Sequence, residues 1–288
     1  MKTLKSVEFH LTDACNLTCS GCNRFNDMGL RGFEDWNKHR SAYENFSKNV
    51  EIEREIDILG GEPLLHPHIN QIITDLRNFW PSNEIVILTN GLLLHKVKGI
   101  MDQIVQNKIS LDISVHNKEW RIPIIKKLNE LTGEKIKLRW KIIKDKVPIA
   151  EFIFNDTKHT ITLTEHFYQN SLGQPNGVLR PYESDADKAW EACVAKCPTL
   201  HEGKLYKCPI SHAMPTALRQ KNNIDYTQKQ KDLIDTFPYI KCNDIQNISD
   251  EEFNKMIYNK IDQCSLCPEK YVIHKIEQRK KINPNYFD

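Results

Sequence analysis

The sequence predicts an α/β fold in which six βα units form the first two thirds of the chain and a cysteine-rich region follows. Strand-like and helix-like segments alternate up to residue 166, and Gly60-Gly61 and Asn90-Gly91 end two of the strands. Beyond residue 170 the periodicity fades into residues 171–184, a stretch rich in Gly, Pro and Asn that is typical of a linker. Repeated βα units imply a parallel sheet with right-handed crossovers, and six units imply a barrel or part of one.

The alternating segments define the expected elements in chain order. Strands are expected at Val7–Thr12, Glu55–Leu59, Glu84–Thr89, Ile109–His116, Lys135–Ile143 and Thr160–His166. Helices are expected at Tyr43–Val50, His68–Trp80, His95–Asn107 and Trp120–Leu131. A chain of 288 residues suits one large domain or two smaller ones, and we divide it into residues 1–180 and 181–288.

One face of the later strands is polar. Polar residues occupy alternate positions in three strands: Ser110, Asp112, Ser114 and His116; Lys135, Lys137, Arg139 and Lys141; and Thr160, Thr162, Thr164 and His166. Either the helices leave this face wet, or it lines an open lumen that holds something polar. Crossover helices should cover the outer face, so we favour the open lumen. Its basic residues suit a small polar substrate, an anionic one included.

Composition excludes several classes of protein. Forty basic and 38 acidic residues leave a net charge of +2, which disfavours nucleic-acid binding through bulk charge. Hydrophobic residues make up 40% of the chain, too many for a disordered protein. No apolar run approaches the roughly 18 residues of a membrane span, and the first residues lack the apolar core of a signal peptide. We therefore expect a cytoplasmic protein without a membrane partner.

The nine cysteines are clustered. Cys15, Cys19 and Cys22 form a C-x3-C-x2-C triplet after the first strand, and no cysteine occurs between Cys22 and Cys193. A chain that is not exported keeps its thiols reduced, so clustered thiols favour metal or iron–sulfur ligation over disulfides. Three thiolates can hold three irons of a four-iron cluster and leave the fourth open, as catalysis requires. A structural zinc would need a fourth ligand, for which His10 is the nearby candidate.

A second motif, Gly60-Gly61-Glu62-Pro63, follows the second expected strand. Glycines at this point let a ligand approach the backbone, and the Glu62 carboxylate can accept hydrogen bonds from an amine. Alone, the motif is weak and fits a simple strand-to-helix turn. Its place after the cysteine triplet makes it specific.

The triplet and the Gly-Gly-Glu stretch, in this order and on these elements, resemble the radical S-adenosylmethionine (radical SAM) superfamily. The resemblance covers residues 4–170 and implies a partial (β/α)6 TIM-like barrel. It also implies that Cys15, Cys19 and Cys22 ligate a [4Fe–4S] cluster whose fourth iron is chelated by the amino and carboxylate groups of SAM.

The same resemblance implies which residues contact SAM. These are Gly60, Gly61 and Glu62 at its amino group, Ser114 and Arg139 at its ribose and carboxylate, and Asn90 in the cavity. One position departs from the family pattern, because Gly21 stands where an aromatic residue usually precedes the third cysteine. Either Phe25 supplies that surface for the adenine, or backbone contacts alone hold it.

The remaining cysteines form a second group. Cys197 and Cys208 bracket a predicted hairpin, and Cys264 and Cys267 form a C-x2-C pair. Four thiolates are enough to close a cluster completely. The arrangement resembles the auxiliary-cluster extension called SPASM or, in its short form, twitch, which implies a small α+β region with a second [4Fe–4S] cluster.

Alternatives remain for this second group. Cys193 can replace Cys197 as a ligand, and Cys242 is either a buried thiol or a ligand to a further cluster. A four-cysteine zinc site also fits the C-x2-C spacing. The radical SAM resemblance upstream favours iron and sulfur.

The resemblance implies that a reduced cluster cleaves SAM to methionine and a 5′-deoxyadenosyl radical, which takes a hydrogen atom from an unactivated C–H. With an auxiliary cluster as electron acceptor, we expect net two-electron oxidation of a small sugar- or alcohol-like substrate. A peptide maturase that cross-links or epimerises its substrate is the alternative, and RNA modification is less favoured. A one-electron donor such as flavodoxin or ferredoxin is the expected protein partner. A ferredoxin-like carrier or a zinc-stapled binding module would cleave no SAM.

Four further residues are candidates for the cavity. They are His10, His116, Lys141 and His166. A single histidine at a strand end is more often a hydrogen-bonded spectator, so no proton-transfer role is assigned to any of them, nor to His212.

Overall fold

A ten-stranded sheet runs through the part of the chain that the structure, a computed structural model, describes: residues 2–143, 147–168, 172–173, 178–222, 224–270 and 273–277. From edge to edge its strands are β15 (Tyr239–Lys241), β14 (Lys204–Tyr206), β13 (Thr199–His201), β2 (Val7–His10), β4 (Glu55–Leu59), β5 (Glu84–Thr89), β6 (Ser110–Val115), β9 (Thr157–Leu163), β8 (Pro148–Phe154) and β7 (Arg139–Ile142). Two-stranded sheets pair β1 (Lys2–Leu4) with β3 (Val50–Ile52), β10 (His166–Tyr168) with β16 (Ile273–Lys275), and β11 (Leu172–Gly173) with β12 (Arg180–Pro181).

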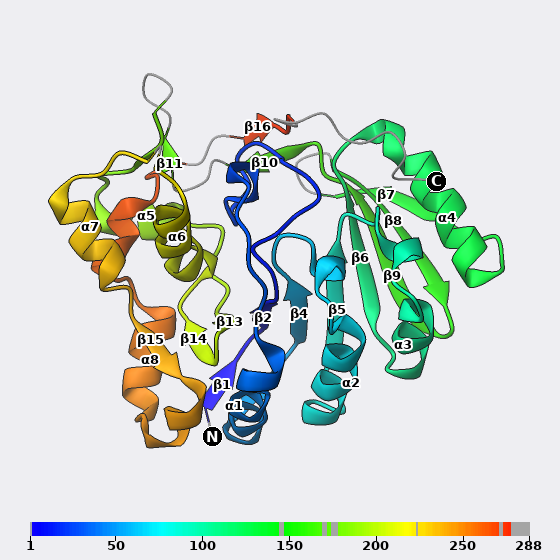
Figure 1. Cartoon of the computed structure of the whole chain (residues 1–288), viewed down its shortest axis with the longest axis horizontal. Coiled ribbons are helices and arrows are strands. Elements are labelled where there is room, and N and C mark those ends of the chain that lie inside the picture. The colour runs from blue at the N-terminus through cyan, green and yellow to red at the C-terminus, as the bar shows by residue number, and fades with distance from the viewer. Residues whose placement is uncertain are drawn as a thin grey trace.

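The helices fall into two groups (Figure 1). The α-helices are α1 (Trp36–Asn49), α2 (Ile69–Phe79), α3 (Ile100–Gln106), α4 (Arg121–Thr132), α5 (Ala186–Ala192), α6 (Pro209–Gln220), α7 (Gln228–Asp235) and α8 (Asp250–Tyr258). Short 3-10 helices are η1 (Asn26–Met28), η2 (Pro63–Leu65), η3 (Leu94–Lys96), η4 (Lys118–Trp120), η7 (Cys242–Asn247) and η8 (Asp262–Leu266). Helices α1 to α4 accompany the parallel strands, and α5 to α8 gather at the other end of the molecule. None of the helices in the described ranges is both long and apolar enough to cross a membrane.

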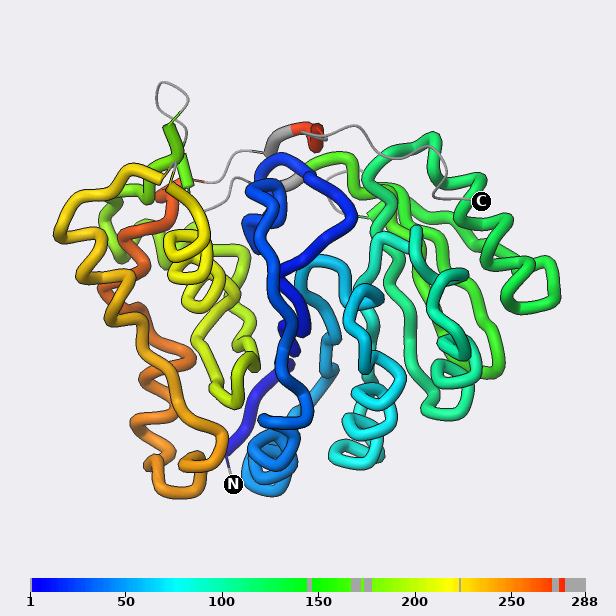
Figure 2. The backbone as a smooth tube through the Cα atoms, in the orientation of Figure 1, coloured from blue at the N-terminus to red at the C-terminus, as the bar shows by residue number. Residues whose placement is uncertain are grey.

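Six neighbouring strands, from β13 through β2, β4, β5 and β6 to β9, run parallel. The chain is therefore a mixed α/β protein with a large, parallel-rich sheet. Carboxyl ends of parallel strands meet at one edge of a sheet, where ligands bind in open α/β folds. The loop after β2 rises to this edge beside β16 (Figure 2), and Ser20 N donates to Glu277 O at 2.8 Å.

Alternation along the strands separates an apolar face from a polar one. Phe9 on β2 packs against Trp36 and Tyr43 of α1, with ring centroids 6.1 and 5.1 Å away. Asp35 caps α1 by accepting a hydrogen bond from Lys38 N, which satisfies a donor in the first turn. Glu8, the neighbour of Phe9, points to the other face and is half-buried. The helices thus cover the apolar face, and the polar positions share the opposite one.

The expected place of the strand at residues 135–143 was wrong. β9 pairs directly with β6, while β7 lies at the sheet edge and is connected through β8, a strand that the sequence reading missed. Strand β8 turns back into β9 through Asn155 and Asp156, both with positive φ (45° and 59°). Such a two-residue turn makes an antiparallel hairpin, so no parallel crossover connects β8 to β9.

The cysteine-rich region continues the main sheet. The predicted hairpin turn at Glu202 and Gly203 is confirmed, and it joins β13 to β14. β13 pairs with β2, and Leu200 and Leu205 belong to the same hydrophobic core as Phe9. A second group of buried apolar residues surrounds Met214 on α6. Part of the expected linker, at residues 171 and 174–177, lies outside the described residues.

Candidate functional site

A cavity of about 280 Å³ opens at the carboxyl ends of β2, β4, β5 and β6. All three cysteines of the triplet line it. Its other lining residues are Glu8, Leu17, Asn23, Arg24, Asn26, Leu59, Gly60, Gly61, Leu88, Thr89, Asn90, Ser114 and His116. The structure therefore brings the triplet together with Gly60, Gly61, Asn90 and Ser114, as the sequence predicted.

Gly60 and Gly61 hold the start of the cysteine loop against β4. Gly61 N donates to Thr12 O at 2.6 Å, and Glu62 N donates to Ala14 O at 2.9 Å. A Cβ atom on Gly61 would lie 2.1 Å from Ala14 O, and one on Gly60 would lie 2.5 Å from Thr12 O. Both positions thus require glycine, because the backbone of residues 60 and 61 packs directly against the segment that leads to Cys15. This packing requires the glycines even when no ligand is bound.

The Glu62 carboxylate is buried and organises the end of β5. It accepts hydrogen bonds from Thr89 Oγ1 at 2.7 Å, Asn90 N at 2.9 Å and Leu64 N at 3.1 Å. Burial raises the pKa of Glu62 to about 7, against the opposing effect of these bonds. Asn90 in turn donates to Asn16 Oδ1 in the cysteine loop at 2.7 Å. Glu62 is not among the residues that line the cavity, so its expected contact with an amine remains a proposal.

The thiols suit a metal cluster. Burial raises the pKa of Cys15 and of Cys22, so without a cation both thiols stay protonated at neutral pH. Leu17 N donates a hydrogen bond to Cys15 Sγ at 3.4 Å, which helps to orient the sulfur. A bound cluster displaces such protons and stabilises the thiolates. The three sulfurs on one wall of a cavity therefore fit a cluster that leaves one iron open.

Several predicted residues lie elsewhere. Arg139 is on the exposed edge strand β7 and lines a different cavity, and Lys141 donates to Glu151 there at 2.8 Å. Both residues lie away from the first cavity because β7 is at the sheet edge, separated from β6 by β9 and β8. His166 is exposed on β10, which pairs with β16. Phe25 is fully buried against the second apolar group, so it offers no surface to an adenine in this cavity.

The two candidate histidines at strand ends differ. His116 lines the cavity, and its Nδ1 lies 3.1 Å from Thr164 O. Burial lowers the pKa of His116, so the ring is neutral. His10 is fully buried away from the lining and lies 2.9 Å from Asp13 Oδ1.

Two carboxylates on the polar face were missed. Glu8 on β2 and Asp57 on β4 are register neighbours, and Asp112 lies on the same face of β6. Burial and the nearby Glu55 and Glu8 raise the pKa of Asp57 to about 8. Arg24 forms an ion pair with Glu8. Asp112 was among the predicted polar positions. Glu8 and Asp57 were missed because each is a single acid in one of the first two strands, for which no polar alternation was predicted. The described charges that face the interior here are thus mainly acidic, which reverses the expected basic lining.

A second cavity collects four cysteines. Cys193, Cys208, Cys264 and Cys267 line it together with apolar side chains. Cys197, the expected ligand, lies apart, 3.7 Å from Ser6 Oγ and close to the carboxylates on β2 and β4. The two cysteines are separated because Cys197 lies just before β13, which pairs with β2, whereas Cys193 directly follows α5.

The cationic side chain of Lys207 accompanies these four thiols. Lys207 is buried, and its Nζ donates to Ile257 O at 2.8 Å and to Met256 O at 3.1 Å. It also lies 4.3 Å from the centre of the Trp190 ring. Burial raises the pKa of Cys193, Cys264 and Cys267. A cluster with four thiolates carries negative charge, which the Lys207 ammonium would offset. Cys242 is buried elsewhere, against Asn45 of α1.

No protein-family model matches the chain. It is 28% identical over 144 residues to the probable GTP 3′,8-cyclase of Methanococcus vannielii, covering 47% of this chain and 44% of that protein. It is also 28% identical over 123 residues to the GTP 3′,8-cyclase of Petrotoga mobilis, covering 40% and 36%. The chain thus spans less than half the length of these relatives. These matches support the resemblance of this chain to the radical SAM superfamily.

Distant likenesses among solved structures include two proteins in complex with AdoMet, which is SAM. BtrN in complex with AdoMet and 2-DOIA covers 93% of both chains at 15% identity, with a TM-score of 0.45. The structure of anSMEcpe with bound AdoMet covers 40% of this chain and 33% of that chain at 18% identity, with a TM-score of 0.32. These are distant likenesses.

Proposed function

We propose that this chain is a radical SAM oxidoreductase that oxidises a small, polar, positively charged alcohol with the help of an auxiliary cluster. One observation carries the proposal: three cysteines line a cavity whose wall also includes Glu8, next to Asp57 on a polar sheet face. The proposed cluster ligands and the Glu8 carboxylate thus line one cavity.

The first site would hold a [4Fe–4S] cluster on Cys15, Cys19 and Cys22, with SAM on its open iron. When bound, these groups supply a carbon radical that takes a hydrogen atom from a substrate C–H. Asn90, Ser114 and His116 line the space beside the triplet and offer polar contacts to SAM or substrate. The backbone at Gly60 and Gly61 fixes where the triplet begins.

The acidic face would select the substrate. A cationic group, such as the ammonium of an amino alcohol, would compete with Arg24 for Glu8 and would favour the charged form of Asp57 beside it. After losing a hydrogen atom from carbon, an alcohol reaches the ketone by losing one electron and the hydroxyl proton. Asp57, whose pKa burial raises to about 8, is mostly protonated near neutral pH. A bound substrate ammonium would lower this pKa, and the resulting carboxylate can then take up the hydroxyl proton.

The second site would provide the electron acceptor. Cys193, Cys208, Cys264 and Cys267 would hold a complete [4Fe–4S] cluster, with Lys207 as a nearby counter-charge. Such a cluster supplies a place for the electron that the substrate loses. Four cysteine ligands leave no open iron, so SAM would bind at the first site alone.

SAM cleavage tests the proposed chemistry. The anaerobically reconstituted chain with dithionite should form 5′-deoxyadenosine from SAM, and a C15A/C19A/C22A variant should lose this activity. C242A is the matched control, because Cys242 is buried outside both cysteine groups. Absence of cleavage in a chain with intact clusters would overturn the proposal in favour of an electron carrier.

Substrate preference is tested separately. Amino alcohols should raise 5′-deoxyadenosine formation and appear as carbonyl products, while neutral and anionic analogues of the same size should do so much less. E8Q should weaken this preference, seen as a rise in KM of about tenfold for the cationic substrate, the scale of one charge-assisted hydrogen bond. Equal rates for all three charge classes would contradict an acidic recognition site.

A purine nucleotide is a second candidate, because the curated relatives are GTP 3′,8-cyclases. Among the described residues that line the first cavity, Arg24 is the one arginine or lysine, and it is already paired with Glu8. A triphosphate would have to break that ion pair to bind there, which places this candidate second. GTP, as well as short peptides and RNA, belong in the same assay. Product formation from one of them without oxidation of amino alcohols would replace the first candidate.

A further inference from the structure

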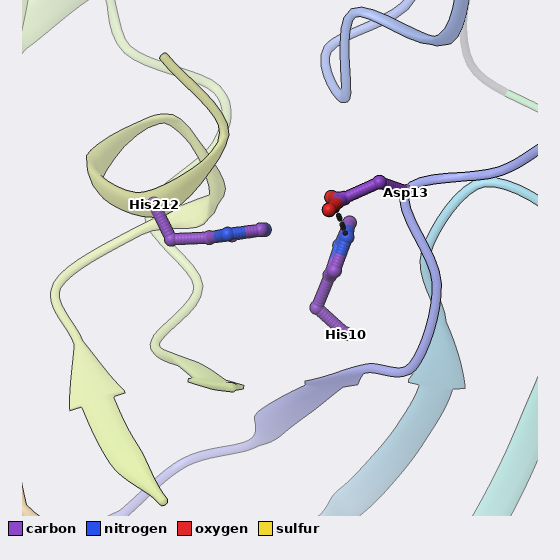
Figure 3. Close-up of side chains that lie close together, drawn as sticks. All are labelled: His10, Asp13 and His212. Atoms are coloured by element: carbon purple, nitrogen blue, oxygen red, sulfur yellow. Dashed lines mark hydrogen bonds and ion pairs between the residues drawn. The ribbon is translucent and has the colours of Figure 1, made fainter. Parts of the chain in front are cut away.

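Three potential metal ligands meet outside both cysteine groups. They are His10 at the end of β2, Asp13 in the loop that leads to Cys15, and His212 on α6. One ligand atom of each lies within 4.8 Å of the other two. The His212 ring points toward His10 and Asp13 (Figure 3). Two segments that are 199 residues apart, from Asp13 to His212, thus bring their donor atoms to one point.

The group is buried and incompletely hydrogen-bonded. His10 is 0% exposed, His212 3% and Asp13 6%. His10 Nε2 lies 2.9 Å from Asp13 Oδ1, whereas His10 Nδ1 and His212 Nε2 are both buried without a hydrogen-bond partner. An unpaired buried ring nitrogen is unfavourable, and a bound ion would give such a nitrogen a partner.

The imidazole rings of His10 and His212 lie close together. Their centroids are only 4.0 Å apart, a separation at which two imidazolium ions would repel each other. Neutral imidazole nitrogen with one carboxylate is a donor set that zinc and other divalent transition metals accept.

Two of the positive groups around the site are paired with carboxylates. The ring of His201 lies 4.4 Å from that of His212, and His201 is paired with Glu34 at 3.0 Å. Arg24 is paired with Glu8. Arg219 on α6 also acts on Asp13 and His212 and donates a hydrogen bond to Thr216 at 3.0 Å, so Asp13 is the anionic donor that offsets both this charge and the ion.

We propose that His10, Asp13 and His212 bind one divalent transition-metal ion, for which Zn²⁺ is the probe. The ion would connect the loop that carries Cys15 to helix α6, which begins directly after Cys208. It would therefore fix the two cysteine-bearing segments relative to each other. This site does not depend on the proposed reaction, because its test counts bound metal and not turnover.

The test counts zinc and iron together. The full, reconstituted chain is equilibrated with chelator-buffered Zn²⁺, separated from free metal, and measured by mass spectrometry. The parent should hold about one zinc per chain with its iron unchanged. H212Q should lose at least nine tenths of that zinc at the same free concentration, again with iron unchanged. H159Q is the matched control, because His159 is buried with an unpartnered Nε2 but lies outside the group.

Two results would overturn the site. The first is a parent that binds no more zinc than H212Q does. The second is zinc uptake that displaces iron, which would place the zinc on the cysteines. If H212Q loses iron as well, the substitution has disturbed the fold. The zinc content of D13N then decides whether the site exists, because asparagine has nearly the same shape as aspartate. D13N that keeps its iron and loses zinc supports the site, and D13N that retains full zinc rejects it.

Discussion

Cys193 and Cys197 are four residues apart, yet they lie in different chemical surroundings. Cys193 ends α5 and shares an apolar cavity with three other thiols. Cys197 lies near Glu8 and Asp57, where a negatively charged cluster would be repelled. Spacing along the chain left both residues open as ligands, because only the strand pairing of β13 with β2 separates them.

Replacement of each of these two cysteines by alanine should therefore have unequal effects on the iron content. C193A should remove about four irons per chain, since a cluster with three protein ligands in an apolar cavity is less stable. C197A should keep its full iron content. Iron quantification with absorption spectra on both variants checks this, and equal iron loss in the two would count against the assigned ligand set.

Asp57 makes stability depend on pH. Its pKa rises from 3.8 to about 8 in the folded protein, chiefly because of burial. The native state holds this proton more tightly than the unfolded chain, so the contribution to stability is full below about pH 4 and is lost as pH rises through about 8.

Denaturant unfolding at two pH values tests this effect. Between about pH 5 and pH 9 the free energy of unfolding of the parent should fall more than that of D57N, by about 1.4 kcal/mol for each pKa unit of difference. E251Q, a change to an exposed carboxylate on α8, should follow the parent. A D57N variant whose pH dependence matches that of the parent would show that this carboxyl is not perturbed.

At the scale of elements, the cysteine loop is held by β4 and β5. Backbone bonds from Gly61 and Glu62 fix its start, and Asn90 reaches its Asn16. The sequence located this loop correctly because the triplet and the Gly-Gly-Glu stretch are local patterns. It assigned the glycines to ligand approach, whereas the close contact with Thr12 and Ala14 requires them already in the protein itself.

Gly61→Ala should break this docking. A Cβ atom 2.1 Å from Ala14 O forces the loop away from β4, at a cost of about 1–3 kcal/mol in the free energy of unfolding. Iron at the first site should fall, while iron at the second site stays. G173A is the control, because its Cβ would meet neighbours only at 3.5 Å or more. A G61A variant with full iron and unchanged stability would argue against the tight approach.

Long-range pairing explains what the sequence did not reveal. The strands from Val7 to His116 were located because each is followed by a helix and pairs with its neighbour. Arg139 was misplaced because the Asn155-Asp156 turn, a usable hairpin signal, was overlooked. No local pattern predicts that β13 returns from the far end of the chain to lie beside β2, nor that His212 reaches His10.

For the whole molecule, the sheet links the first two thirds to the cysteine-rich region. β13 hydrogen-bonds to β2, and Leu200, Leu205 and Phe253 extend the core that contains Phe9. The division at residue 180 therefore follows composition, while the hydrophobic core crosses it.

A chain that ends at residue 184 should not fold cooperatively. It would expose the β2 edge and lose the side chains that β13 and β14 pack against it. Circular dichroism and limited proteolysis should show loss of tertiary structure and rapid cleavage. Cooperative unfolding of this fragment near the midpoint of the full chain would instead indicate an independent domain.

The central claim is that two clusters differ in access to SAM. Electron paramagnetic resonance of the reduced, reconstituted chain, with iron counted on the same sample, tests it most directly. The account predicts about eight irons per chain and two overlapping signals, of which SAM shifts one and leaves the other unchanged. Spectra that SAM leaves entirely unchanged, in a chain with full iron, would contradict an open iron at Cys15, Cys19 and Cys22.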